Sequence, residues 1–184
     1  RYDVFDLEEC YLCAPVAAEI VTKVRDWANE QKLVVFDNHH QDGLLRNLII
    51  REGKNTGELM VNLETSENSF PCVDSFRELF KGDERITSLI WSTVMQRRGT
   101  PTYREYTTLA GRGAIFEEMN LPTGESLKFK IAPDAFFQPN THQAEKLYAE
   151  ALQAADLTGG ETVYDLYCGT GTIGLFCAHQ AARV

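Results

Sequence analysis

Residues 163–184 read "VYDLYCGTGTIGLFCAHQAARV", a glycine-rich turn between an expected strand and an expected helix. Gly169, Gly171 and Gly174 satisfy the pattern G-x-G-x-x-G. Glycine lets the backbone turn tightly and lets a ligand approach where a Cβ would collide. The helix that follows offers unpaired N–H groups to an anionic group. The pattern therefore predicts a nucleotide-type ligand, and a turn whose glycines serve packing alone is the alternative.

An acidic residue, Asp165, precedes the glycines. A carboxylate there suits a ligand with a positive pole, such as the sulfonium and amino group of S-adenosylmethionine, and suits a pyrophosphate poorly. The alternative is a carboxylate that caps the following turn. A dinucleotide site would need an acidic residue roughly 20 positions past the turn to hold a ribose. That position lies beyond Val184, so the dinucleotide alternative stays open.

The residues before this turn predict a helix and then the strand. Asn140 and Gln143 resemble a capping box that begins the helix, and Gly159 and Gly160 are expected to end it. The expected buried stripe consists of Leu147, Ala151, Leu152 and Ala155. The segment "ETVYDLY" is then expected to form a strand. This order of helix and strand predicts that residues 132–184 begin a Rossmann-like α/β domain with a parallel sheet.

Residues 1–131 have a different pattern and predict an α+β central domain, a mostly antiparallel sheet with helices. Residues 15–32 place Val16, Ile20, Val24 and Trp27 at helical spacing, and residues 71–84 form a second candidate helix. Between turn sequences lie β-branched runs, each expected to be a strand: "LVVFD", "LLRNLIIRE", "GELMVNLE" and "ITSLIWSTVM". "GAIFEEM" and "ESLKFKI" flank the turn "NLPTG" and predict a hairpin.

The composition is that of a soluble globular protein, expected in the cytoplasm with no membrane partner. The 184 residues are 43% hydrophobic, carry a net charge of −9 and contain no run near the ~18 apolar residues of a membrane helix. One cluster of arginines near Tyr103 and Tyr106 is a candidate surface for nucleic acid binding, although an ordinary solvated loop would explain these arginines equally well. It consists of Arg97, Arg98, Arg104 and Arg112. The chain begins with Arg1, which suggests a piece of a longer protein.

Two blocks together resemble the RNA uracil-5-methyltransferase family. They are "FFQPNTHQAEKLY" and, about 25 residues later, "VYDLYCGTGTIGL"; the upstream "GLLRNLIIR" and "TGELMVNL" are similar to the central domain of that family. The resemblance implies methylation of C5 of a uridine in structured RNA, with S-adenosylmethionine as cofactor. Ribosomal RNA is expected ahead of transfer RNA as the substrate. Which uridine is modified and the oligomeric state stay open.

The resemblance also implies residue roles. Gln138 would lie between cofactor and target uracil, with Phe136 near the base. Tyr167 and Thr172 would contact the cofactor, although relatives often have Asn at the position of Thr172. With Asp165, Gly169 and Gly171 these residues complete the predicted cofactor site.

The family nucleophile is a cysteine in a Ser-Cys-Asn-Pro block, and this sequence has no such block. No catalytic residue is therefore assigned, and the chain alone is expected to be inactive. Its five cysteines are expected to be reduced thiols: Cys10, Cys13, Cys72, Cys168 and Cys177. Some relatives hold a [4Fe-4S] cluster, and Cys10 matches its fourth ligand; the other three would precede Arg1.

Two other functions stay open at this point. A dinucleotide-dependent oxidoreductase would use the same glycine turn. A noncatalytic RNA-binding module would need only the basic candidate and the central sheet, and its RNA affinity would depend strongly on salt.

Overall fold

The described residues form two compact units. A computed structural model describes residues 8–11, 13–66, 69–95 and 101–184. The first unit contains the described residues up to Ile50, with Val61–Glu84 and Leu89–Ala110; the second contains Arg51–Met60, Arg85–Ser88 and Gly111–Val184. The predicted domain boundary after residue 131 lies within the second unit. The division into domains therefore stays a prediction.

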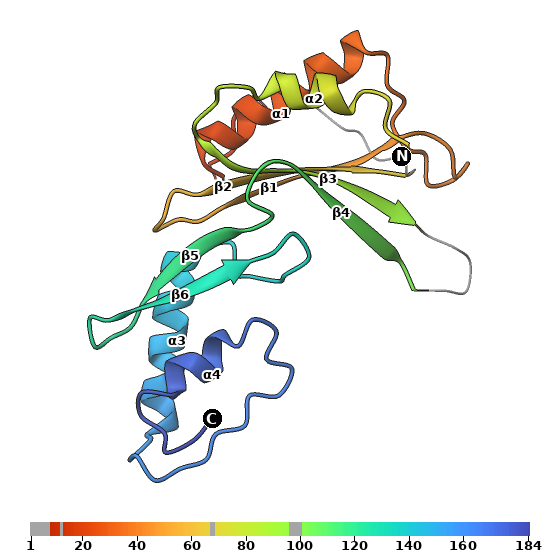
Figure 1. Ribbon diagram of the computed structural model, residues 1–184. Helices are drawn as coiled ribbons and strands as arrows, with labels where there is room; N and C mark the ends of the chain where they lie inside the picture. The colour runs from red at the N-terminus through yellow and green to blue at the C-terminus, as the bar shows by residue number, and fades with distance from the viewer. Residues whose placement is uncertain (1–7, 12, 67–68, 96–100) are drawn as a thin grey trace. The chain divides into compact units, whose positions relative to one another are not determined.

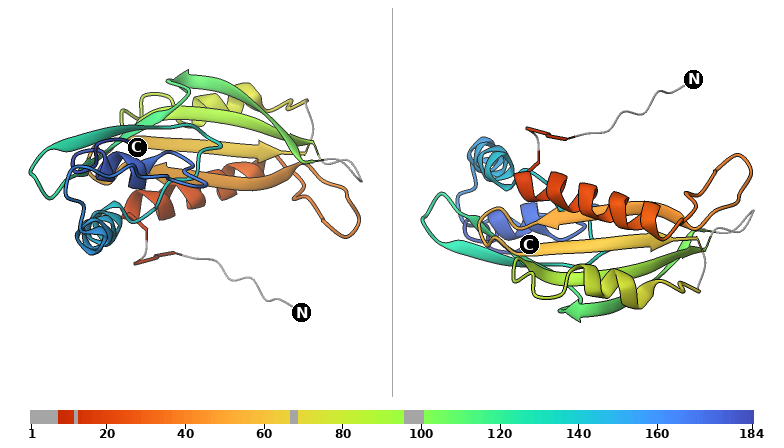
Figure 2. Two further views of the ribbon diagram at one scale, coloured as in Figure 1. Left: turned by 90° about the horizontal axis from the view of Figure 1, so that it is seen from below. Right: turned by 90° about the horizontal axis from the view of Figure 1, so that it is seen from above.

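Two helices cover one face of the sheet in the first unit (Figures 1 and 2). α1 (Pro15–Glu30) begins with a proline at its first position and buries Ile20, Val24 and Trp27, as predicted. α2 (Val73–Leu79) is shorter than expected and buries Phe76. The Trp27 and Phe76 rings lie 5.3 Å apart, so the two helices meet over an aromatic core.

The four strands of the larger sheet follow one another in chain order. They are β1 (Leu45–Glu52), β2 (Leu59–Thr65), β3 (Ile86–Met95) and β4 (Tyr103–Gly111), in the order β1-β2-β3-β4. The sequence predicted β1, β2 and β3. It missed β4, which was treated as part of an arginine-rich loop, because this strand is exposed along most of its length and shows no apolar alternation.

The strand predicted at residues 33–37 is wrong. Val35 makes an isolated bridge to Leu45, and Asp37 makes one to Asp42. Isolated bridges do not form a ladder, so the apolar residues of this segment do not define a strand. Val34 and Val35 are largely exposed, which agrees with a connection rather than a core strand.

The predicted hairpin is present in the second unit. β5 (Ile115–Asn120) pairs antiparallel with β6 (Ser126–Ile131), with Ile115 opposite Ile131. Alternate side chains of β5 are buried, including Glu117. The period of two therefore predicted the hairpin correctly, but it gave no sign that one of its inward residues is an acid.

α3 (Thr141–Ala155) begins where the sequence predicted. The side chain of Asn140 accepts the backbone N–H of Gln143 at 3.1 Å. The buried stripe consists of Thr141, Ala144, Tyr148 and Leu152, so of the expected stripe only Leu152 is confirmed. Leu147 is 60% exposed. The helix also ends before the two glycines, with Asp156 in a left-handed conformation.

The strand predicted at residues 161–167 does not form. Among the described residues its backbone makes one isolated bridge, between Thr162 and Arg183, because no neighbouring strand provides a ladder. The helix after the glycine turn is present but short, as α4 (Thr172–Cys177). Phe176 of α4 packs edge-on against Tyr148 of α3 at 5.3 Å. The parallel sheet expected in residues 132–184 is thus not observed.

A buried carboxylate connects three segments of the second unit. Glu117 has no exposed surface, and its oxygens accept the backbone N–H of Lys54 at 2.5 Å and of Asn55 at 3.1 Å. The Thr141 hydroxyl donates to the same carboxylate at 2.6 Å. Glu117 therefore joins the β1–β2 turn and β5 to the first residue of α3.

Replacing Glu117 tests this connection. In Glu117→Gln an amide nitrogen replaces one acceptor oxygen, so at least one donor loses its partner and the charge-assisted bonds weaken. We expect the free energy of unfolding to fall by about 2 kcal/mol. Urea denaturation measures it, with Glu118→Gln on the adjacent, partly exposed residue as the control. Equal stability of the two variants would contradict the role of Glu117.

Candidate functional site

The glycine turn is open on the side where a Cβ would lie. Gly169 and Gly171 have φ of 58° and 73°, values that favour glycine, and a Cβ built at either meets no atom within 4 Å. The N–H of Gly171 donates to the Cys168 carbonyl at 2.8 Å and closes the turn. Backbone conformation requires these two glycines, while the space beside them is free for a ligand.

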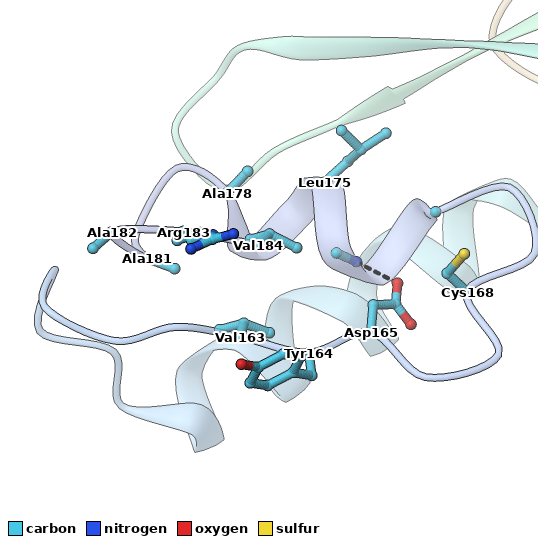
Figure 3. A pocket seen from close by; sticks show the side chains of 12 residues that line it. Val163, Tyr164, Asp165, Cys168, Leu175, Ala178, Ala181, Ala182, Arg183 and Val184 are labelled. Atoms are coloured by element: carbon cyan, nitrogen blue, oxygen red, sulfur yellow. Dashed lines mark hydrogen bonds between the residues drawn. The ribbon is translucent and has the colours of Figure 1, made fainter.

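The third glycine serves packing. A Cβ at Gly174 would lie 3.0 Å from Oδ2 of Asp165 and 3.1 Å from Cγ1 of Val184. Its N–H donates to the same Asp165 oxygen at 2.9 Å, shown by the dashed line in Figure 3. Asp165 thus caps the following turn, which was the alternative to ligand binding. Its other carboxylate oxygen, Oδ1, does not take part in this bond. A carboxylate has lone pairs for further partners, so capping and ligand binding are compatible.

A cavity of about 650 Å³ lies beside the turn (Figure 3). Its walls combine small apolar side chains with two charged ones, Asp165 and Arg183. Tyr164 presents an aromatic ring from the same segment as Asp165. A cleft of this size with few polar groups is typical of sites for small organic ligands.

The structure brings together some of the predicted cofactor residues. Asp165 and Gly171 line the cavity, and Gly169 lies in the same turn. Tyr167 is fully exposed with φ of 62°, and Thr172 is buried with its hydroxyl 2.9 Å from that of Thr170. Neither of these two lines the cavity, so their contacts with a cofactor stay predictions.

Gln138 precedes α3 and is half-buried. Tyr148, on the buried face of α3, is 7% exposed. Burial raises the pKa of the Tyr148 hydroxyl; the Gln138 side chain opposes the rise and the Asp165 charge adds to it. Tyr148 is thus influenced by a residue of each block. Sequence reasoning missed it, although it stands four residues after Ala144 on the buried face.

The two phenylalanines beside Gln138 differ. Phe136 is 72% exposed, which leaves its ring available to a base. Phe137 packs against Phe129 with ring centroids 5.6 Å apart, as a core aromatic does. The contact of Phe136 with substrate stays a prediction.

The described arginines of the basic candidate are paired. In the first unit Arg104 Nε lies 2.9 Å from Glu64, and in the second unit Arg112 lies 2.6 Å from Glu58. Burial alone would raise the pKa of Glu58, but the Phe116 N–H and Arg112 outweigh it and lower that pKa. Arg97 and Arg98 lie outside the described residues. The charges of the two described arginines are thus largely neutralised by these glutamates.

Comparisons with known proteins identify relatives along the whole chain, although no family model matches. An uncharacterized RNA methyltransferase of Protochlamydia amoebophila is 37% identical over 202 residues, covering 100% of this chain and 45% of the relative. One of Bacteroides thetaiotaomicron is 38% identical, covering 98% and 39%. Along its whole length the chain is similar to RNA methyltransferases. It spans about two fifths of the length of the curated relatives that it matches.

A solved structure of an RNA methyltransferase has a similar fold. The tRNA (uracil-54, C5)-methyltransferase of Pyrococcus abyssi, in complex with S-adenosyl-L-homocysteine, matches with a TM-score of 0.73 and 28% identity. The match covers 96% of this chain and 41% of that protein. A mixed sheet with helices is therefore a fold that this chain shares with a solved RNA methyltransferase.

The cysteines do not form a metal site among the described residues. No group of three or more His, Cys, Asp or Glu side chains there could hold a metal ion, and Cys10 as a cluster ligand stays a prediction. Burial and the Asp165 charge raise the pKa of Cys177, which disfavours the reactive thiolate. Within the described part of the chain, no helix has the length and apolar character to cross a membrane.

The loop that leads to Asp165 depends on one carboxylate. Glu161 accepts hydrogen bonds from the backbone N–H groups of Thr158, Gly159 and Gly160 and from the Thr158 hydroxyl. The Thr158 hydroxyl and N–H contribute most to lowering the pKa of Glu161 to about 2. The pKa of Glu161 is lower in the folded loop than in the unfolded chain. The hydrogen bonds to its carboxylate therefore stabilise the loop fully above pH 4.5, and this stabilisation is lost as the pH falls toward 2.

NMR can follow this titration. The amide shifts of Thr158 and Gly159 should change with a midpoint near pH 2, and Glu161→Gln should remove the transition. A midpoint near 4.5, the ordinary pKa of a glutamate side chain, would show that the carboxylate is not held by these donors.

The packing role of Gly174 is tested by hydrogen exchange. In Gly174→Ala the new Cβ pushes Asp165 away and weakens its bond to the amide of residue 174. We expect that amide to exchange about tenfold faster, since a bond to a charged acceptor is worth about 1.5 kcal/mol or more. Gly160→Ala is the matched control, because a Cβ there meets no atom within 4 Å. Unchanged exchange at residue 174 would contradict the expected collision.

Proposed function

We propose that the protein transfers a methyl group from S-adenosylmethionine to C5 of a uridine in structured RNA. The observation that carries the proposal is the glycine turn of the second unit, where Gly169 and Gly171 leave open space and Asp165 faces a cavity while it accepts the Gly174 N–H. The similarity to a tRNA uracil-C5 methyltransferase solved with S-adenosyl-L-homocysteine supports it. An oxidoreductase gains no support from the comparisons.

The residues beside the cavity fit this cofactor. Gly169 and Gly171 leave room for a ligand, and the free oxygen of Asp165 can accept from an ammonium group or face a sulfonium. Arg183 offers a positive charge for a carboxylate. S-adenosylmethionine supplies an electrophilic methyl group when bound. We place its positive pole beside Asp165, the acidic residue that precedes the glycines.

Other residues would orient the uracil. The side-chain amide of Gln138 can both donate and accept, which matches the polar edge of a uracil ring. Phe136 exposes its ring and can stack on an unpaired base. The reaction needs a thiolate that adds to C6 and a base that removes the C5 proton. We assign neither role to a described residue, so the residues named here bind and orient.

The expectation that ribosomal RNA is the substrate remains part of the proposal. The Pyrococcus protein is named for transfer RNA, so the two RNA classes are distinguished by experiment. The protein as its gene encodes it is incubated with S-adenosylmethionine and with each unmodified RNA. Nucleoside analysis should then detect 5-methyluridine in ribosomal RNA. Absence of 5-methyluridine from both RNAs would overturn the proposal.

Gln138→Ala tests the site within that assay. Loss of one positioned polar group commonly lowers kcat by about 100-fold or more, and we expect such a loss here. The control is Gln153→Ala, which removes the same side chain from an exposed position of α3. Circular dichroism checks that both variants fold. Equal activity of the two would contradict the role of Gln138.

A further inference from the structure

One arginine connects the end of β1 to the loop between β6 and α3. Nη1 of Arg51 donates to the carbonyl oxygen of Ala135 at 2.5 Å, although the two residues are 84 positions apart in the sequence. Both belong to the second unit. The bonded carbonyl stands directly before Phe136, and Gln138 follows two residues later. The arginine therefore holds the loop just before the two residues that the proposed function assigns to the base.

Two further features hold the loop after this point. Phe137 packs against Phe129 of β6 with ring centroids 5.6 Å apart, and it contacts the apolar cluster of the second unit. Pro139 restricts the backbone of Gln138 to extended conformations. Phe136 lies between the bonded carbonyl and Phe137 and is 72% exposed. Its ring is thus open to a ligand while the residues on both sides of it are held by the protein.

The same short segment of β1 and its turn also holds the far end of the loop. The backbone N–H of Lys54 donates to the carboxylate of Glu117. That carboxylate also accepts the hydroxyl of Thr141, the first residue of α3. The segment from Arg51 to Lys54 therefore fixes the loop at both ends. A loop that is fixed in this way loses little further conformational entropy on binding, so its side chains are pre-organised for a ligand.

We propose that Arg51 is a positioning residue that holds the loop with Phe136 and Gln138 ready for the target base. The inference rests on the proposed function. Arg51 acts through the carbonyl of Ala135 and does not contact the base. Because a guanidinium stays protonated in proteins, this bond is charge-assisted over the whole working pH range. Loss of the bond releases the loop beside Phe136, and a small displacement of orienting groups slows a reaction considerably.

Arg51→Met removes the guanidinium and keeps an unbranched side chain. In the full protein as its gene encodes it, we expect kcat for RNA methylation to fall about tenfold, the scale of one charge-assisted hydrogen bond. KM for the RNA and Kd for S-adenosyl-L-homocysteine should stay unchanged. Arg77→Met is the matched control, because Arg77 is an exposed arginine of α2 that pairs with Asp74. Full kcat in Arg51→Met would overturn the inference.

A contact between Arg51 and an RNA phosphate would give a different kinetic result. It would raise KM for the RNA, leave kcat unchanged and reduce the salt slope of RNA binding by about one. That outcome would overturn the positioning role. A wild-type protein that makes no 5-methyluridine would instead refute the proposed function itself.

NMR tests the bond independently of activity. The N–H of Phe136 belongs to the peptide group whose carbonyl accepts from Arg51, and hydrogen bonds polarise the groups that they join. The amide shift of Phe136 should therefore change in Arg51→Met and stay the same in Arg77→Met. An unchanged shift in Arg51→Met would overturn the inference even if kcat fell, because the arginine would then not hold the loop.

Discussion

The buried carboxylate of Glu117 is the constraint on which the second unit depends. An ionised group without solvent is costly unless donors surround it, and here three backbone N–H groups and a hydroxyl do so. Those donors come from the β1–β2 turn, from the neighbouring residue of β5 and from α3. Gly53 allows the turn to come this close, since a Cβ there would lie 2.8 Å from the Phe116 carbonyl. A displacement of α3 would take the Thr141 hydroxyl away from this buried carboxylate.

This constraint fixes the rotation of α3 about its own axis. Thr141 must face β5 to reach Glu117, so the residues that follow at intervals of three or four also face inward, including Ala144 and Tyr148. Leu147 consequently points outward although it is more apolar than Tyr148. Tyr148, on the same face, then packs against Phe176 of α4. A polar contact at the start of α3 therefore also influences how α3 meets the helix after the glycine turn.

Local patterns in the sequence predicted the elements whose signals are local. The period of α1, the hairpin around residues 121–125 and the cap at Asn140 follow from short-range propensities. The predicted stripe of α3 was correct for Leu152 and wrong for Leu147, because apolarity favoured Leu147, whereas a tertiary hydrogen bond decides which face is buried. The glycine pattern predicted a turn with room for a ligand, and Gly169 and Gly171 have that geometry.

Other features needed three-dimensional information. The strand expected at residues 161–167 has apolar residues but no ladder, because strand formation depends on neighbours and not on composition alone. The ring contact between Tyr148 and Phe176 joins residues that are far apart in sequence, and no spacing rule connects them. Their joint placement depends on packing between α3 and α4.

β4 has the exposed, polar composition that hid it from sequence patterns, and it stands at one end of the strand order. A terminal strand presents unpaired backbone groups that can recruit strands from other molecules and lead to aggregation. Arg104 and Glu105 place charges of both signs on this strand. A second chain that paired there would have to bury them. The feature that conceals β4 from prediction thus also protects the sheet from uncontrolled growth.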